Sequence, residues 1–239
     1  MTDKSSPDES NEETSEEQAA PASIGLSISS NSALLGFFAL LSTAIIAGTF
    51  LGTEDKIIEQ KRQAQLKALY QIVPPDQHDN DMLKDNIDIQ TDTLGHRKIQ
   101  RLFLARNNLQ PQTLIYPVTA RDGYSGDIDF IVGVNTKDGS IAGVRVLSHK
   151  ETPGLGDKVD LRKSDWVLAF NNRRLGDPDI EGWAVKKDGG IFDGFTGATI
   201  TPRAVTASIV ATLHYHHQNV EVLLKKFEPA ADAPPSENK

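Results

Sequence analysis

The sequence predicts an α+β protein in which a single N-terminal transmembrane helix is followed by a domain with an antiparallel or mixed sheet and a C-terminal helix. Three observations predict this fold class. One long apolar run lies at residues 33–51, strand-like runs follow between residues 99 and 147, and apolar residues recur at helical spacing after Pro202. We expect five parts: a disordered acidic tail at 1–32, the membrane helix at 33–52, a juxtamembrane helix and connector at 53–98, the domain at 99–228, and a second disordered tail at 229–239.

Charge is concentrated at the two ends of the chain. The net charge is −8, and residues 1–23 hold seven acids and one lysine, while residues 228–239 hold three acids and one lysine. The body between them is therefore neutral and offers no basic surface, so nucleic acid is not an expected partner. The chain has no cysteine, which excludes disulfides, thiolate metal sites and iron–sulfur clusters. A redox function would need a bound organic cofactor.

The apolar run at residues 33–51 has nineteen residues without a charge. As a helix it measures roughly 28 Å, about the thickness of the hydrocarbon core of a bilayer. A buried core helix is usually shorter, and a cleaved signal peptide begins with a basic segment, whereas this tail is acidic. We expect a retained single transmembrane helix. The positive-inside rule places the domain in the cytoplasm, although large domains can cross despite such a bias; the cations are Lys4 before the run and Lys56, Lys61, Arg62 and Lys67 after it.

The segment after the membrane helix changes from helix to strands. Residues 53–73 carry a loose apolar stripe that Pro74-Pro75 ends, which predicts a helix that is a spacer, packs on the body or docks on a membrane partner. Residues 76–98 are polar and are expected to be a loop. Strands are expected at 102–105, 113–120, 128–134 and 141–147, with a hairpin at Asp138-Gly139. We further expect a short helix at 159–170, a strand at 183–187 and a turn at 188–190.

The string Asp193-Gly194-Phe195-Thr196-Gly197-Ala198-Thr199 lies directly before the last predicted helix. Pro202 suits a first helical position, because its missing N–H would have no partner there. Thr199 would then lie where free N–H groups and the positive end of the helix dipole favour a phosphate. Gly194 and Gly197 would let the backbone approach a ligand closely. The alternative is an ordinary helix start, with Thr199 or Thr201 as the capping residue.

A second candidate segment runs from His149 to Asp157, directly after the strand at 141–147. Its sequence is His-Lys-Glu-Thr-Pro-Gly-Leu-Gly-Asp, so it offers hydrogen-bonding side chains, a stiff proline and two glycines. Loops of this kind carry function more often than the elements they join. The segment by itself is also compatible with an ordinary turn.

Taken together, the two segments resemble a known family. Residues 193–199 match the flavinylation motif Asp-x-x-Thr/Ser-Gly-Ala-Thr, in which FMN is joined through its phosphate to the last threonine. The chain resembles the FMN-binding domain family, in particular the G subunits of the Rnf (Rsx) electron transport complex. This resemblance covers the membrane helix and the segments 123–126, 149–157, 186–190 and 192–205. The C subunit of the sodium-translocating NADH:quinone reductase shares the flavin motif, resembles the chain less elsewhere, and is the nearest alternative.

The resemblance implies a covalent FMN on Thr199, attached by a phosphoester. It also implies that a separate flavin transferase, which uses FAD and magnesium, installs the group, because a threonine hydroxyl is a poor nucleophile and no catalytic triad is apparent. Asp193 would help the transferase to recognise the site, or would serve in the turn. The other residues expected to bind the cofactor are Thr196, Gly197, Ala198, Glu151, Thr152, Leu155 and Gly156.

The same resemblance implies that the chain is a redox subunit rather than a free-standing enzyme. It would pass electrons within a membrane-bound complex that couples electron flow between NADH and ferredoxin to ion movement. Its partners would be the other membrane subunits, and the chain would lie in the bacterial inner membrane with a cytoplasmic N-terminus and a periplasmic domain. A reductase with non-covalent FMN and a non-redox assembly anchor remain the alternatives.

Aromatic residues and histidines are the remaining candidates. Trp183 or Tyr124 would stack on the flavin ring or belong to the core. His214 and His217 have a spacing that can chelate metal, but no carboxylate accompanies them, so we expect an exposed polar face and assign no metal site. His149 is expected to hydrogen-bond within its loop.

Overall fold

The structure is a computed structural model that describes residues 22–228. The chain divides into two compact units at Glu59 and Gln60. Helix α1 (Ala22–Ile72) begins inside the segment expected to be an unstructured tail, and residues 1–21 and 229–239 lie outside the described residues. Within α1, residues Ser32–Glu54 form a span long and apolar enough to cross a membrane, and its large apolar side chains are exposed.

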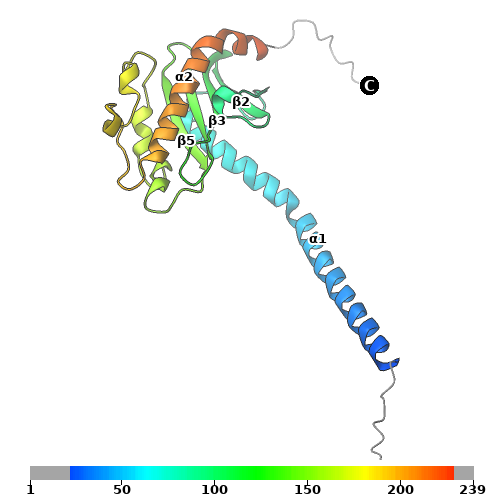
Figure 1. The fold of residues 1–239 in the computed structure, drawn as a ribbon. Coiled ribbons are helices and arrows are strands. Elements are labelled where there is room, and N and C mark those ends of the chain that lie inside the picture. The colour runs from blue at the N-terminus through cyan, green and yellow to red at the C-terminus, as the bar shows by residue number, and fades with distance from the viewer. Residues whose placement is uncertain (1–21, 229–239) are drawn as a thin grey trace, which may run out of the picture. The chain divides into compact units, whose positions relative to one another are not determined.

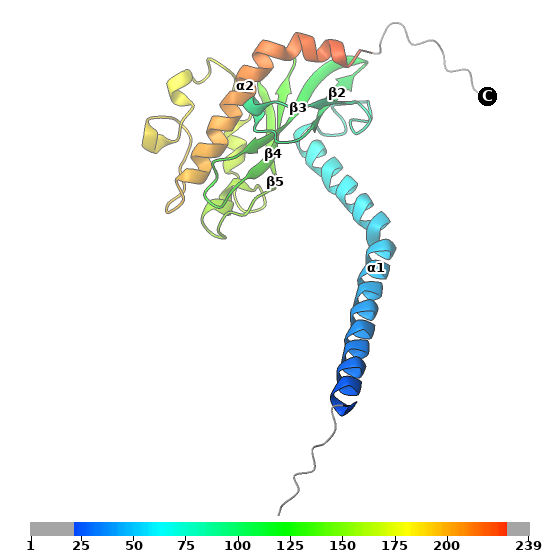
Figure 2. The ribbon, with the colours of Figure 1, turned by 45° about the vertical axis from the view of Figure 1, so that its right-hand side comes forward.

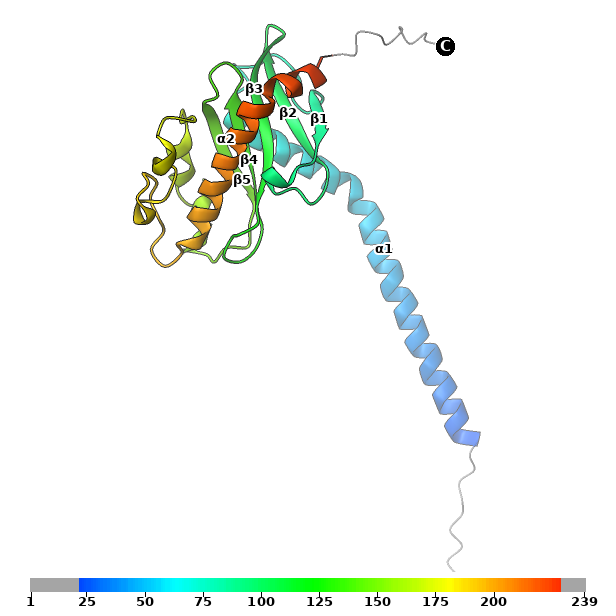
Figure 3. The same cartoon turned by 45° about the horizontal axis from the view of Figure 1, so that its top comes forward.

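The second unit is built on one antiparallel sheet, whose five strands follow one another in the order of the chain. Figure 3 shows these strands beside one another, with the long helix α2 (Ile200–Lys226) across them. Each strand pairs with the next in an antiparallel arrangement, and the connections include tight turns. An example is the Asp138-Gly139 turn predicted between the last two. The strands are β1 (Asn86–Ile89), β2 (Gln100–Asn107), β3 (Gln110–Ala120), β4 (Ile128–Asn135) and β5 (Ile141–Ser148).

Both faces of the sheet are buried, so the domain has three layers. Successive side chains of a strand point to opposite faces. In β2, Leu102 and Leu104 therefore face the α2 side, while Phe103 and Ala105 belong to the other apolar cluster. Figures 1 and 2 show α2 lying over the sheet. The opposite face is covered by the last turns of α1, through Leu69 and Ile72.

The end of α1 approaches the sheet closely because two glycines lie beneath it. A Cβ atom at Gly133 of β4 would lie 2.3 Å from Cγ2 of Ile72, which is closer than any real contact. A Cβ atom at Gly143 of β5 would lie 3.4 Å from Cγ1 of the same isoleucine. The juxtamembrane helix is therefore packed on the body of the domain, which was one of the alternatives that the sequence left open.

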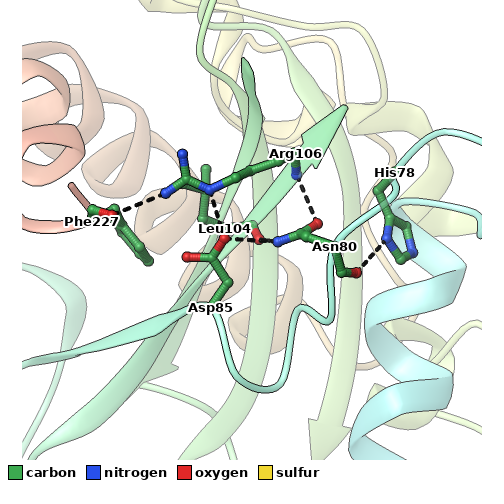
Figure 4. A network of polar contacts seen from close by, with 6 residues as sticks. All are labelled: His78, Asn80, Asp85, Leu104, Arg106 and Phe227. Atoms are coloured by element: carbon green, nitrogen blue, oxygen red, sulfur yellow. Dashed lines mark hydrogen bonds and ion pairs between the residues drawn. The ribbon is translucent and has the colours of Figure 1, made fainter. Parts of the chain in front are cut away.

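A polar network joins the connector after α1 to β2 and to the end of α2 (Figure 4). The Asn80 amide donates to Oδ2 of Asp85 at 2.9 Å and accepts from the backbone N–H of Arg106 at 2.9 Å. The Arg106 guanidinium donates to Asp85 at 2.6 Å and to the carbonyl oxygen of Phe227 at 3.1 Å. These mostly buried bonds order a polar segment that was expected to be a loop, and β1 forms directly after it.

The segment between β5 and α2 differs from the prediction. The expected helix at 159–170 is wrong, because the chain forms two separate 3-10 turns, Gly156–Val159 and Trp166–Phe170. The expected strand at 183–187 is also wrong: it is reduced to one bridge between Val185 and Phe192, followed by the 3-10 turn Lys186–Asp188. Packing of aromatic rings, not backbone periodicity, organises this segment. The rings are those of Trp166, Phe170, Trp183, Phe192 and Phe195.

Candidate functional site

Residues 193–199 form a turn that is anchored by the packing of two aromatic side chains, Phe195 and Trp166. The ring of Phe195 is buried and lies 5.1 Å from that of Trp166, whose indole N–H donates to the carbonyl oxygen of Asp193 at 2.7 Å. The N–H of Ala198 donates to the carbonyl oxygen of Phe195 at 3.1 Å. Gly197 takes φ +81° between them, a conformation that glycine adopts without the cost other residues pay. The string is therefore a fixed turn, not a flexible tether.

Helix α2 begins directly after this turn. Thr199 is the N-cap residue and Ile200 the first helical residue. Pro202 is consequently the third helical residue, so its predicted first position is wrong by two residues. It still lies in the turn whose N–H groups have no acceptor within the helix. The N–H groups of Ile200 and Thr201 point out of this helix end beside Thr199, where an anion is favoured.

The three threonines near the start of α2 have different surroundings. Thr196 is exposed in the turn, and Thr199 is partly exposed. The Thr199 side chain makes no capping hydrogen bond, which excludes the simple capping role that the sequence left open for it. Thr201 is fully buried, and its hydroxyl donates to Oε2 of Glu151. Burial and this bond remove Thr201 from contact with any ligand, whereas the hydroxyl of Thr199 is available.

The loop after β5 is joined to the start of α2 through Glu151. This side chain is only 4% exposed. Its Oε1 accepts the backbone N–H of Ser125 at 2.9 Å, and its Oε2 accepts the hydroxyl of Thr201. Both oxygens are thus engaged by the protein, which makes Glu151 a link between three segments. Its backbone N–H donates to Nδ1 of His149 at 3.1 Å, so the expected hydrogen-bonding role of His149 within the loop is confirmed.

Two glycines allow the segments to meet. A Cβ atom at Gly156 would lie 2.5 Å from Oε2 of Glu151 and 2.9 Å from Oγ1 of Thr201, so no side chain fits there. A Cβ atom at Gly197 would lie 3.4 Å from Cδ2 of Leu155. The structure therefore brings together the two segments that the sequence singled out, although some forty residues separate them along the chain.

The surface around Thr199 carries exposed apolar side chains. Tyr124 is 68% exposed, next to the Ser125 that binds Glu151, and Leu155 and Ile200 are 40% and 45% exposed. Thr152 is also exposed on the same loop. Trp183, by contrast, is buried and donates its indole N–H to the carbonyl oxygen of Pro178 at 3.2 Å. Of the two aromatic candidates, only Tyr124 is exposed, and Trp183 belongs to the core.

Two exposed ion pairs lie near the string. The ammonium of Lys186 lies 2.6 Å from Oδ1 of Asp193, so the first residue of the string is paired with a cation. Arg203, on the first turn of α2, donates two hydrogen bonds to Asp188. These bonds lower the pKa of the Asp188 carboxyl and raise that of the Arg203 guanidinium. Through these pairs, the segment 186–190 is joined to both ends of the site.

Sequence reasoning missed several residues of this site. Nothing in the spacing singled out Ser125, which acts through its backbone, or Trp166, whose indole holds the turn. Asp157 is buried, and its Oδ1 meets no hydrogen-bond partner within the described part of the chain. An unpaired buried carboxylate oxygen of this kind calls for a partner or ligand. Only its place beside Gly156, at the end of the noted loop, could have pointed to it.

The histidines of α2 differ in solvent exposure. His214 and His217 are exposed, so the predicted polar face is confirmed. His216, which the sequence did not single out, is buried, and the hydroxyl of Tyr116 lies 2.9 Å from its Nδ1. Burial, and secondly the neighbouring His217, lowers the pKa of His216 to about 4. At neutral pH it is an uncharged part of the core.

Comparison with known proteins finds two family models that match the chain. Residues 123–214 match the family model of the FMN-binding domain, and residues 24–72 match that of the RnfG N-terminal region. The G subunit of the ion-translocating oxidoreductase complex of Vibrio atlanticus (strain LGP32) is 44% identical over 197 residues, 82% of this chain and 94% of that protein. The corresponding G subunit of Pseudomonas aeruginosa (strain UCBPP-PA14) is 45% identical over 201 residues, 84% of this chain and 94% of that protein.

The chain belongs to the family of Rnf-type G subunits of ion-translocating oxidoreductase complexes.

Among solved structures, the crystal structure of Shewanella oneidensis NqrC matches with a TM-score of 0.43 and 24% identity. The match covers 59% of this chain and 69% of that one. The family model for the FMN-binding domain includes the Ser125 loop, the Glu151 loop and the start of α2. The two family models and the relatives confirm the resemblance to Rnf G subunits. The structure confirms the α+β fold with an N-terminal apolar helix and a C-terminal helix.

The residues at the start of α2 fit FMN. Free N–H groups at the helix start suit its phosphate. The glycine turn leaves the backbone uncovered at Gly197, and the exposed side chains of Tyr124, Leu155 and Ile200 suit an apolar ring.

Proposed function

We propose that this chain is the electron-carrying subunit of its complex and that it holds FMN through a phosphoester on Thr199. The observation that carries the proposal is the hydroxyl of Thr199, which lies at the start of α2, is partly exposed and makes no capping bond. Bound FMN would supply one- and two-electron transfer. The protein would hold the phosphate at the helix start and offer Thr196, Gly197, Ala198, Thr152 and Leu155 as the nearby surface, while the buried Gly156 would leave room for the contact between Glu151 and Thr201.

The attachment needs a second protein. Glu151 is the carboxylate joined to the start of α2, and both of its oxygens are already occupied, so it cannot serve as a base for Thr199. We propose a flavin transferase that uses FAD and magnesium. The hydroxyl oxygen of Thr199 would form a bond to the phosphorus of the FMN half of FAD, and the bond from that phosphorus to the AMP half would break. AMP would leave, and the hydroxyl proton would pass to a base of the transferase. Asp193 would take part in recognition by the transferase.

Mass spectrometry of the peptide that contains Thr199 tests this proposal. Protein made together with the transferase should carry one FMN less one water on Thr199, and Thr199→Ala should carry none. Ser208→Ala is the matched control, because it removes a hydroxyl farther along α2, outside the proposed binding surface, and should keep the modification. An unmodified Thr199 in protein that supports full electron transfer by the complex would refute the proposal. Full activity of the complex with Thr199→Ala would instead favour a non-redox anchor.

We also propose that the chain crosses the bacterial inner membrane once, with its N-terminus in the cytoplasm and its domain in the periplasm. The apolar span Ser32–Glu54 and the membership of a membrane complex family support the anchor. The cations after the span favour the opposite orientation, but that bias governs short loops more than large domains.

The absence of cysteine makes the orientation simple to test. Leu109→Cys places one thiol at a residue that is 83% exposed on the domain, and Ser10→Cys places one before the span. A membrane-impermeant maleimide should label Leu109→Cys in cells with a permeabilised outer membrane, and should label Ser10→Cys only after the inner membrane is broken. The reverse pattern would place the domain in the cytoplasm.

A further inference from the structure

We propose that Pro202 and Glu151 are positioning residues that keep the hydroxyl of Thr199 out of a helix-capping hydrogen bond, so that its oxygen stays available for bond formation. This inference rests on the proposed attachment of FMN to Thr199.

An N-cap threonine normally has extended backbone angles, and its side-chain oxygen accepts the N–H of the second or third helical residue. Thr199 has φ −77° and ψ −22°, which are helical angles, and its side chain makes no such bond. Thr199 therefore occupies the N-cap position of α2 but does not cap the helix with its side chain.

Pro202 removes one of the two donors that the hydroxyl could bind. It occupies the third helical position, where capping bonds are commonly made, and it has no N–H. The remaining donor is the N–H of Thr201. Proline is tolerated in the first turn of any helix, but here it has a further effect, because it leaves the Thr199 oxygen without one of its usual donors.

Glu151 fixes the residue that provides the remaining donor. The hydroxyl of Thr201 donates to Glu151 and its side chain is fully buried, while Glu151 is itself held by the N–H of Ser125. Gly156 leaves the space for this contact. The first turn of α2 is thereby locked in the geometry in which Thr199 makes no capping bond. In this proposal Glu151 acts through Thr201, whereas the family resemblance implied that Glu151 lines the flavin.

Two consequences follow for the chemistry. The lone pairs of the Thr199 oxygen are not engaged by the helix end, so they can meet an electrophilic phosphorus. The N–H groups of Ile200 and Thr201 are also not engaged by a capping side chain, so they can meet the negative charge on the phosphate.

The test uses Pro202→Ala, which restores an N–H at the third helical position. Amide hydrogen exchange on the flavin-free chain should show this new N–H protected, and Thr199→Val in the same background should abolish the protection. With purified transferase and FAD, kcat for attachment to Pro202→Ala should fall at least tenfold with KM unchanged, because recognition is intact but the hydroxyl is engaged. Ser208→Ala is the matched control, since it places alanine farther along α2, and it should react as the wild type does.

Glu151 is tested in the same assay by two substitutions. Glu151→Gln keeps one acceptor oxygen and should retain partial reactivity, whereas Glu151→Leu keeps none and should react more slowly still, even where circular dichroism shows a native fold. Attachment to Pro202→Ala at the wild-type rate, or an unprotected amide at residue 202, would overturn the inference. If wild-type Thr199 accepts no FMN, the proposed function fails, while the exchange experiment still decides whether these residues prevent capping.

Discussion

Gly156 offers the sharpest test of how the site is assembled. Replacing it with alanine would put a methyl group 2.5 Å from Oε2 of Glu151 and 2.9 Å from Oγ1 of Thr201. The carboxylate would have to move, which would break its bond to Thr201 or to Ser125. A hydrogen bond to a charged group contributes about 1.5–3 kcal/mol, and crowding a packed site costs about 1–3 kcal/mol. The lower chain entropy of alanine offsets only about 0.4–1 kcal/mol.

We expect Gly156→Ala to lower the free energy of unfolding by about 2–4 kcal/mol, which corresponds to a fall of about 5–15 °C in the unfolding temperature. Near-UV circular dichroism of the full chain in detergent would measure the unfolding temperature, because both tryptophans of the chain, Trp166 and Trp183, are buried in the domain. Gly194→Ala is the matched control: nothing lies within 4 Å of its Cβ position, so its unfolding temperature should not fall. Equal melting of the two variants would show that Glu151 does not hold the loop to α2.

Three further predictions concern the rest of the domain. Arg106→Met should cost about 1–3 kcal/mol in urea unfolding, because it leaves the mostly buried Asp85 without its cation; an unchanged midpoint would contradict this. His216 has a pKa of about 4 in the fold against 6.5 when unfolded. The unfolded chain therefore binds the extra proton between these values, and stability should fall by about 3 kcal/mol as pH drops from 6.5 towards 4. His216→Gln should remove most of that loss in urea titrations at pH 7 and 4.5, leaving the part due to His96, whose pKa burial also lowers. Lys186→Met should leave the unfolding midpoint unchanged, because its ion pair is exposed, yet it should alter KM for the transferase.

Part of the fold was readable from local pattern. The strands at 113–120 and 128–134 were predicted within a few residues, because strands that are buried on both faces are rich in β-branched and aromatic residues along their length. The helix after Pro202 was predicted from its apolar spacing. Strand β1 was missed because it has only four residues, and its place depends on pairing with β2.

The segment 149–192 shows where local pattern fails. Residues 159–170 were predicted to form a short helix and residues 183–187 a strand, and each run contains a tryptophan, Trp166 and Trp183. Both instead serve an aromatic cluster that orders short turns. Contacts between residues far apart in the chain override propensity here. The role of Pro202 was misjudged for a related reason, since the first residue of α2 is set by the turn before it.

The sequence by itself determined the apolar span, the neutral body, the strand pattern and the motif that ends at Thr199. Each of these features depends only on the order and spacing of neighbouring residues. Tertiary structure alone decided that the hydroxyl of Thr201 is engaged while that of Thr199 makes no capping bond. These two threonines are chemically alike and lie two residues apart, and only the partners that folding brings to them make them different. Thr201 meets Glu151 from a loop fifty residues away and is buried, while the Thr199 side chain is partly exposed and makes no capping hydrogen bond.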